Sequence, residues 1–289
     1  MADKVLILGG YGNFGKRIAE ALTRSGVPVI IAGRDAARAD ACAADLPAGL
    51  AEAASFDARQ MLGEQLTRLR PGVVVNTCGP FQTSTYDIAE CCIEASVHYI
   101  DLADGRDFVT GISALEGRAR AKGVAVVSGA STVPGLSSAV IEHFRGEFSS
   151  LDALRFGISP GQGAERGLAT TQGIMTYVGK PLRAFAGDEA PSYGWQGLYR
   201  QDFPVLGPRW MANCDIPDLD LLPAIYGFRS IRFSAGLEIA PLHLGLWALS
   251  WAVRLGLPLN LPGRAAWLLK ASNLFDRFGS ADGGMFMIL

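Results

Sequence analysis

Cysteine is scarce in this sequence, and its arrangement points neither to a metal site nor to a disulfide framework. The 289 residues include five cysteines, an odd number, and no two of them have the spacing of zinc ligands. A chain of this length buries roughly 75% of the surface that it exposes when unfolded, so its core needs no such reinforcement. We therefore expect reduced thiols in a cytoplasmic protein, and no bound metal.

A basic excess and a long hydrophobic run are also missing. The formal net charge is −2, whereas a surface that binds nucleic acid carries an excess of lysine and arginine. No segment reaches the roughly 18 uncharged apolar residues expected of a membrane span. The apolar run in DKVLILGG follows the first residues at once, without the pattern of a signal peptide. Nucleic acid is therefore not an expected partner, and a cytoplasmic location is favoured.

Two common catalytic motifs are missing as well. The sequence contains no G-x-S-x-G motif, the turn that carries the serine of many hydrolases. Tyr86 is followed four residues later by Glu90 instead of lysine, which argues against a short-chain dehydrogenase mechanism. Histidine occurs only three times: His98 precedes a strand and is expected at the opposite edge of the sheet, while His143 and His243 are expected to be structural.

The first half of the chain alternates apolar runs with helical patterns. The runs predict strands at Lys4–Leu8, Pro28–Ala32, Glu52–Phe56, Val73–Asn76, Tyr99–Leu102 and Val124–Ser128. Helices are predicted at Phe14–Ser25, Asp35–Leu46, Met61–Leu69, Tyr86–Ser96 and Phe108–Lys122. This alternation predicts an α/β fold, with a doubly wound parallel sheet of the Rossmann type over residues 1–130.

The pattern changes after that point, and residues 131–289 are expected to form a second, α+β domain for substrate binding and dimerisation. A strand is predicted at Leu151–Ser159. Residues 188–215 are rich in glycine, proline and aromatics, so they form either irregular structure around a groove or strands of a second sheet. The last residues, GGMFMIL, predict the start of a strand, as in a sequence that is truncated after Leu289.

Two helical patterns near the end of the chain are unusually apolar. Ile239–Val253 contains no acid, lysine or arginine, and a second pattern covers Gly263–Phe278. Between residues 240 and 279 there are four basic residues and one acid, a local charge of +3. One interpretation is a buried or dimer-interface helix pair. The other is contact with a membrane surface, or a channel for an apolar substrate.

A glycine-rich turn lies between the first predicted strand and the first predicted helix. The six residues Gly10, Tyr11, Gly12, Asn13, Phe14 and Gly15 fit the G-x-G-x-x-G pattern of dinucleotide-binding proteins. In that pattern the first glycine permits the tight turn, the second lets the backbone approach the pyrophosphate, and the third allows close helix packing. The amides at the helix start then face the negative charge of the phosphates.

The residues after the second and third strands bear on which dinucleotide is bound. An NAD site places an acid about 20 residues beyond the glycines, to hold the ribose 2′-hydroxyl. Here Arg34 stands 19 residues after Gly15, and a guanidinium suits the 2′-phosphate of NADP. We therefore favour NADP over NAD, although Asp35 could rotate in to a ribose. Asp57 follows the third strand and either caps the next helix or accepts from the adenine amino group.

Residues 73–106, with the turn NTCGPF and the later HYIDLADG, carry a more specific signal together with LGGYGNFGKRIAEAL. They resemble the saccharopine dehydrogenase-like family of NADP-dependent oxidoreductases, over roughly residues 3–145. The resemblance implies a Rossmann domain and a second α/β domain whose sheet covers the nicotinamide end. It also implies that Thr77, Cys78, Gly79 and Pro80 pass close to the ribose and nicotinamide of the cofactor.

The resemblance implies a pyridine-nucleotide redox reaction, on a C=N or C=C bond of a small or lipid-like molecule. Saccharopine reductases have an Asp-Pro-Gly turn where this chain has Val133-Pro134-Gly135, so a less polar substrate is favoured. Cys78 and Asp104 are the candidate catalytic residues. Nothing basic stands beside Cys78 in the sequence to lower the pKa of its thiol, which favours a packing role for it. Because no convincing acid–base pair is evident, a non-catalytic NADP-binding sensor or scaffold is the alternative.

Overall fold

The computed structural model describes residues 4–183 and 191–289. The chain divides into two compact units, Met1–Gly135 and Leu136–Leu289, and each is described by itself. All five cysteines are free thiols. In the described ranges, no helix combines the length and the apolar character needed to cross a membrane.

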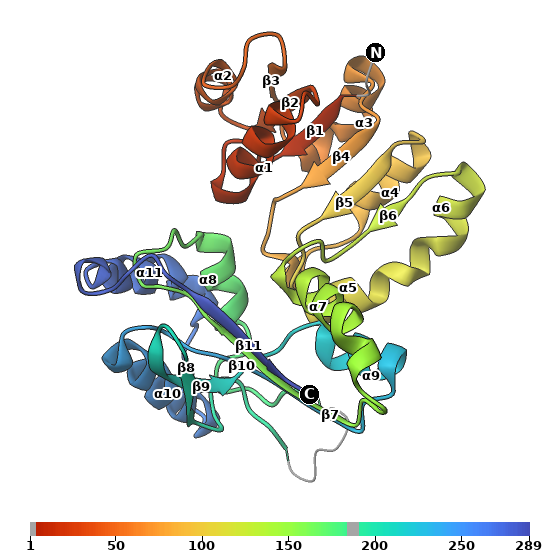
Figure 1. Cartoon of the computed structure of the whole chain (residues 1–289). Helices are drawn as coiled ribbons and strands as arrows, with labels where there is room; N and C mark the ends of the chain where they lie inside the picture. The colour runs from red at the N-terminus through yellow and green to blue at the C-terminus, as the bar shows by residue number, and fades with distance from the viewer. Residues whose placement is uncertain (1–3, 184–190) are drawn as a thin grey trace. The chain divides into compact units, whose positions relative to one another are not determined.

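The first unit is built on a six-stranded parallel sheet (Figure 1). Its strands are β1 (Val5–Leu8), β2 (Val29–Gly33), β3 (Ala51–Ser55), β4 (Val73–Asn76), β5 (His98–Asp101) and β6 (Val126–Val127). They lie in the order β3-β2-β1-β4-β5-β6, so the direction of winding reverses between β1 and β4. This order is that of the doubly wound Rossmann fold, and the predicted fold class is confirmed.

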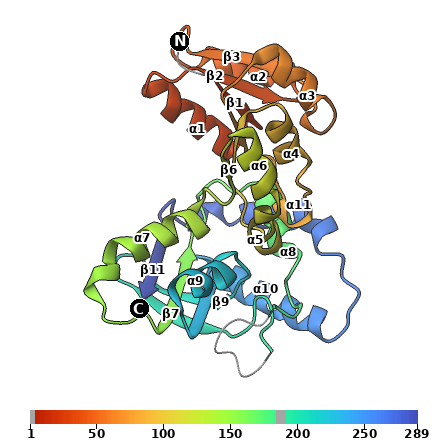
Figure 2. The ribbon, with the colours of Figure 1, turned by 90° about the vertical axis from the view of Figure 1, so that its right-hand side faces the viewer.

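Helices cover both faces of this sheet (Figure 2). They are α1 (Asn13–Arg24), α2 (Ala36–Ala44), α3 (Ala58–Leu69), α4 (Asp87–Glu94), α5 (Arg106–Gly111) and α6 (Glu116–Lys122), with 3₁₀ turns η1 (Phe81–Thr83) and η2 (Ile112–Leu115). Side chains of α1 and α2 pack on one face, and those of α3, α4 and α6 pack on the other. The VLIL run of β1 is buried along its whole length because both of its faces meet helices.

The single helix predicted at Phe108–Lys122 is wrong, because α5 ends at Gly111 and α6 begins at Glu116. The hydroxyl of Tyr86 donates to the carbonyl of Phe108 at 2.8 Å. A continuing α-helix would offer that carbonyl to Ile112. This contact near the break comes from 22 residues upstream, and helical periodicity does not register it.

The second unit contains a five-stranded mixed sheet, as expected of an α+β domain. Its strands are β7 (Ala153–Ser159), β8 (Tyr199–Phe203), β9 (Gly207–Asn213), β10 (Ser230–Ala235) and β11 (Gly284–Ile288), in the order β11-β7-β10-β9-β8. Only β7 and β10 run parallel. Of the two readings of residues 188–215, the strands of a second sheet are correct, while 188–190 lie outside the described residues. The terminal GGMFMIL run does form a strand.

The helices of this unit include the two apolar patterns. They are α7 (Ser137–Phe144), α8 (Leu168–Met175), α9 (Asp218–Tyr226), α10 (Ala240–Arg254) and α11 (Ala265–Asn273), with short turns η4 (Arg145–Glu147), η5 (Pro262–Arg264) and η6 (Asp276–Phe278). The helical turn η3 (Thr132–Leu136) spans the boundary between the two units in the sequence. Parts of α8, α10 and α11 pack around Trp195 and Ala212. Within α10 only His243 and Ser250 are fully buried, so the prediction of a buried helix pair holds for one side only. Burial lowers the pKa of His243 to about 4, which agrees with a structural histidine.

A buried carboxyl group joins two helices of the second unit. The Ser137 hydroxyl, at the start of α7, donates to Oδ1 of Asp218 in α9, and both residues are fully buried. Burial raises the pKa of Asp218 from 3.8 to about 6, and the bond from Ser137 offsets only part of this rise. The folded state therefore favours the protonated acid, and stability falls as the pH rises from about 4 to about 6.

We expect Asp218→Asn to stabilise the protein at pH 8 and to leave it nearly unchanged at pH 4. The gain is at most about 3 kcal/mol, since the amide stays neutral and can still accept from Ser137. Urea unfolding at both pH values measures it. The control Asp202→Asn replaces an exposed carboxylate and should change little at either pH. The same effect of Asp218→Asn at both pH values would contradict the assignment.

Candidate functional site

The glycine turn after β1 folds back over the end of β2. The N–H groups of Gly9 and Gly10 donate to the carbonyl of Ala32 at 2.9 and 3.0 Å. A Cβ on Gly10 would lie 2.9 Å from Cγ2 of Ile31, and one on Gly15 would lie 2.3 Å from the carbonyl oxygen of Gly9. Both positions therefore need glycine for close packing. Gly12 differs, because its Cβ would meet only one atom, the carbonyl oxygen of Gly9 at 3.1 Å.

Helix α1 begins at this turn without a capping side chain. Its N-cap is Gly12, and no acid stands in its first turn. The first N–H groups of a helix have no partner within the helix, and they carry partial positive charge. Asn13 is half-buried and Phe14 is exposed in this first turn. The turn thus presents free donors that could bind an anion such as a pyrophosphate.

The sequence after β2 places two arginines near the glycine turn. Arg34 is exposed directly after β2. Asp35 is committed to α2, because its carboxylate accepts from the Arg38 N–H at 3.1 Å as an N-cap. The Tyr11 hydroxyl accepts from the Asp35 N–H at 3.0 Å, and the Arg38 guanidinium lies over the Tyr11 ring at 4.5 Å. The Asp35 carboxylate is thus engaged with the first turn of α2.

Asp57 serves as the N-cap of α3, which is one of its two predicted roles. Its Oδ1 accepts from the Arg59 N–H at 3.0 Å. Two of the helices that start at this edge of the sheet, α2 and α3, are therefore capped by their own aspartates. The contrast with α1 is direct, since α1 alone of these three leaves its first amides to an outside acceptor.

The NTCGPF turn after β4 contacts the glycine turn. The Thr77 hydroxyl donates to the carbonyl of Leu8 at 2.8 Å, and the Thr77 N–H bonds the same oxygen at 3.0 Å. A Cβ on Gly9 would lie 2.6 Å from the Thr77 hydroxyl and 3.1 Å from the Cys78 sulfur. Gly79 and Pro80 continue the turn through a cis peptide bond. The two turns thus meet at the switch point between β1 and β4, where ligands of such sheets bind.

The prediction that nothing basic lies near Cys78 is wrong. Protein packed around this exposed thiol raises its pKa, but the charges of Arg59 and Arg34 act in the opposite direction. Arg59 begins α3 and Arg34 follows β2, so the fold brings both toward the β4 turn. Sequence spacing could not reveal this, because the three residues belong to different βα connections.

Asp104 also lies beside the β4 turn. Its Oδ1 accepts from Nε2 of Gln82, in η1, at 2.9 Å. Burial raises the pKa of Asp104, and the bond from Gln82 opposes this in part. Asp101, in contrast, uses Oδ1 to hold the N–H groups of Ala103 and Gly129 at 2.9 Å each. Asp101 is therefore a structural anchor, and Asp104 is the carboxyl group left near the turn.

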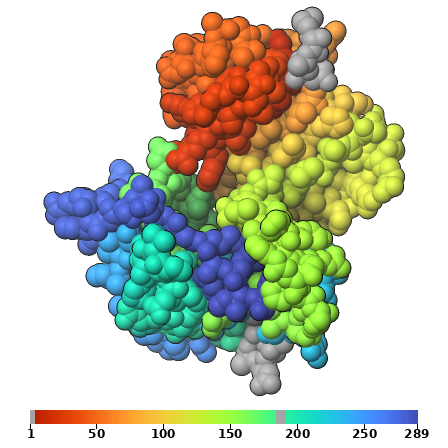
Figure 3. All heavy atoms as spheres, in the orientation of Figure 1, coloured from red at the N-terminus to blue at the C-terminus, as the bar shows by residue number. Residues whose placement is uncertain are grey.

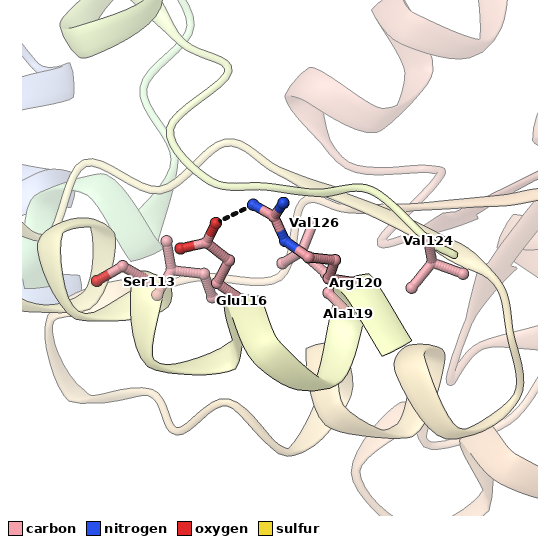
Figure 4. A pocket seen from close by; sticks show the side chains of 7 residues that line it. Ser113, Glu116, Ala119, Arg120, Val124 and Val126 are labelled. Atoms are coloured by element: carbon pink, nitrogen blue, oxygen red, sulfur yellow. Dashed lines mark hydrogen bonds and ion pairs between the residues drawn. The ribbon is translucent and has the colours of Figure 1, made fainter. Parts of the chain in front are cut away.

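A surface pocket of about 400 Å³ lies elsewhere in the first unit (Figure 4). Its lining includes Val124, Val126 and the ion pair between Glu116 and Arg120, whose N···O distance is 2.5 Å. Glu116 and Arg120 belong to α6, Val126 begins the edge strand β6, and Val124 precedes it, so the pocket lies at the amino end of that strand. The pocket is thus separate from the carboxyl edge that carries the glycine turn.

Residues 5–127 match the family model described as the saccharopine dehydrogenase NADP binding domain. This part of the chain belongs to that family. The saccharopine dehydrogenase-type domain therefore includes the whole carboxyl edge described above, from the glycine turn to Asp104, and it is a nucleotide-binding domain of the oxidoreductase type. No curated protein matches the chain.

Solved structures similar to the chain include an amine dehydrogenase from Mycobacterium smegmatis, with a TM-score of 0.47, 13% identity, and coverage of 82% of this chain and 79% of that one. The WlbA (WbpB) dehydrogenase from Thermus thermophilus, solved with NAD and alpha-ketoglutarate, has a TM-score of 0.43 and 10% identity. That match covers 82% of this chain and 73% of that one. An NAD binding oxidoreductase from Klebsiella pneumoniae has a TM-score of 0.41 and 21% identity, and the match spans 56% of this chain but only 43% of that one. All three TM-scores are below 0.5, so these similarities carry no argument about activity.

Proposed function

We propose that the protein is an NADPH-dependent oxidoreductase that reduces a C=N or C=C bond of a small or lipid-like substrate. The observation that carries this proposal is the uncapped start of α1 together with the exposed Arg34 after β2, while the Asp35 carboxylate caps α2. The family match over residues 5–127 supports binding of a nicotinamide dinucleotide, and Arg34 favours the phosphorylated form.

The cofactor would be held by residues from three connections. The glycine turn from Gly10 to Gly15 would hold the pyrophosphate, since the first amides of α1, which begin at Asn13, have no side-chain cap. Arg34 would hold the 2′-phosphate, with Arg38 beside it on the Tyr11 ring. The turn from Thr77 to Pro80 would line the path of the nicotinamide half, because it touches Gly9 at the switch point.

A bound NADPH would supply a hydride to one carbon of the double bond and would itself become NADP⁺. The other atom of that bond must then receive a proton. Asp104 is the candidate donor, because burial raises its pKa and so favours its protonated form. Asp104→Asn should lower turnover while leaving NADPH affinity unchanged. Unchanged turnover would remove Asp104 from this role.

A non-catalytic sensor or scaffold that binds NADP is the second candidate. It is favoured because Asp101 engages backbone donors through Oδ1, so that no acid–base pair with Asp104 is found among the described residues. Absorbance at 340 nm separates the two candidates when NADPH is mixed with a panel of cyclic imines, enals and unsaturated acyl thioesters. Substrate-dependent loss of absorbance supports the reductase, whereas NADPH binding without oxidation on any of them supports the sensor.

A further inference from the structure

The segment from Trp251 to Phe278, here called the α10–α11 segment, exposes a run of large apolar side chains. Five of them have more than half of their surface exposed: Leu255 79%, Leu257 55%, Trp267 68%, Leu274 73% and Phe278 61%. Single exposed apolar residues are ordinary, but a concentration within one short segment marks an interaction surface. This surface belongs entirely to the second unit.

Helix α11 is apolar on two opposite sides. Ala265 and Leu268 pack into the core of the second unit. Trp267, Lys270 and Leu274 follow one another at intervals of three and four residues and are exposed, so they share the outer face. Figure 3 shows the dark blue spheres of this part of the chain projecting from the second unit. A helix whose outer face carries tryptophan and leucine is built to meet something other than water.

The charges of the α10–α11 segment are almost all positive. Arg264, Lys270 and Arg277 are exposed, and the Arg277 guanidinium lies over the Phe278 ring at 4.6 Å. The one acid between residues 240 and 279, Asp276, forms an ion pair with Arg166. The surface therefore combines exposed apolar groups with cations whose acid partner is already occupied.

This combination selects among possible partners. In a twofold dimer through this surface, identical patches face each other, so two positively charged surfaces would come together without acids of their own to pair with. Nucleic acid would satisfy the cations but would leave the leucines unpaired with apolar surface. An anionic lipid bilayer satisfies both, because its phosphates attract the cations and its acyl boundary accepts tryptophan, leucine and phenylalanine.

We propose that the α10–α11 segment docks on the surface of an anionic lipid bilayer. Trp267, Leu274 and Phe278 enter the boundary between headgroups and acyl chains, while Arg264 and Lys270 meet lipid phosphates. The contact is peripheral, in keeping with the lack of a membrane-spanning helix among the described residues. The proposal stands on this surface alone and does not depend on the proposed redox activity.

Vesicle sedimentation with the full chain tests the apolar part of the proposal. We expect the protein to pellet with sucrose-loaded vesicles of phosphatidylcholine mixed with phosphatidylglycerol, and much less with phosphatidylcholine alone. Trp267→Ser combined with Leu274→Ser should lower the partition coefficient at least about tenfold. Ile225→Ser is the matched control for Leu274→Ser, since Ile225 is 63% exposed on α9, which lies well away from α11 in Figures 1 and 2. It should bind as the wild type does.

A charge variant tests the electrostatic part without altering an apolar residue. Lys270→Gln should weaken binding to the anionic vesicles about fivefold at low salt, and high salt should remove the difference. Lys122→Gln, in α6 of the first unit, makes the same change in net charge and should have no effect. If the Trp267→Ser, Leu274→Ser double variant melts at a lower temperature than the wild type, the comparison of Lys270→Gln with Lys122→Gln still tests the proposal.

Three results would overturn the proposal. The first is failure of the wild type to pellet with anionic vesicles at low salt. The second is equal binding by Leu274→Ser, Ile225→Ser and the wild type. The third is a wild-type dimer in light scattering that Trp267→Ser with Leu274→Ser converts to a monomer while vesicle binding is unchanged, which would assign the surface to a second copy of the chain.

Discussion

Arg34→Ala is expected to weaken the binding of NADPH about 10–100-fold and to leave the Kd for NADH within about twofold. Arg34 is exposed directly after β2, and the Asp35 carboxylate is engaged as the cap of α2. A charge-assisted bond to the 2′-phosphate would therefore be lost in the variant, and NADH has no such phosphate. Fluorescence titration of both nucleotides measures the two constants.

Two controls accompany this variant. Arg24→Ala removes an exposed arginine from the far end of α1 and should leave both affinities unchanged. Arg38→Ala should weaken NADPH binding less than Arg34→Ala, because part of the Arg38 guanidinium already lies on the Tyr11 ring. Equal losses for NADPH and NADH in Arg34→Ala would show that Arg34 does not read the 2′-phosphate.

Gly12→Ala is expected to lower NADPH affinity about 100-fold or more while the fold remains intact. The Gly12 backbone is extended, with φ −82° and ψ 174°, which alanine adopts without strain. A methyl group there meets only the Gly9 carbonyl oxygen, at 3.1 Å, which a small movement relieves, so the melting temperature should fall by only about 2–4 °C. The methyl group would instead stand where the backbone must approach the pyrophosphate, and several hydrogen bonds would be lost together.

Gly15→Ala gives the matching contrast within the same turn. Its Cβ would lie 2.3 Å from the Gly9 carbonyl oxygen and 2.7 Å from the Gly10 Cα, so the turn must move. We expect a loss of about 1–3 kcal/mol and a melting temperature lower by roughly 3–10 °C, with weaker binding as a consequence. Unimpaired NADPH binding by Gly12→Ala would remove the glycine turn from the proposed site.

The centre of the first sheet could be predicted because its strands are buried on both faces. The runs VLIL, VIIA and VVVN are continuous and apolar, and they became β1, β2 and β4 at nearly the predicted positions. The length of the edge strand could not be predicted in this way. β6 keeps only Val126–Val127 of a predicted five-residue strand, since it pairs with β5 over two residues at the sheet edge.

In the candidate site too, some features follow from the local sequence and others depend on the order of the strands. The position of Arg34 follows from counting residues beyond the glycine turn, because the βα unit has a nearly fixed length. The approach of Arg59 and Arg34 to Cys78 does not follow from counting, since it depends on how β2, β3 and β4 are ordered across the sheet. The role of Asp57 could be predicted only in part. Local sequence allowed two roles, and the backbone of α3 shows the capping one.

Nucleotide titration of the wild-type protein tests the central claim most directly. The full chain is titrated with NADPH and with NADH by isothermal calorimetry under the same buffer and salt. The arrangement of the glycine turn, Arg34 and Asp35 predicts that NADPH binds at one site and at least about tenfold more tightly than NADH. Absence of binding, or NADH binding as tightly as NADPH, would contradict the account.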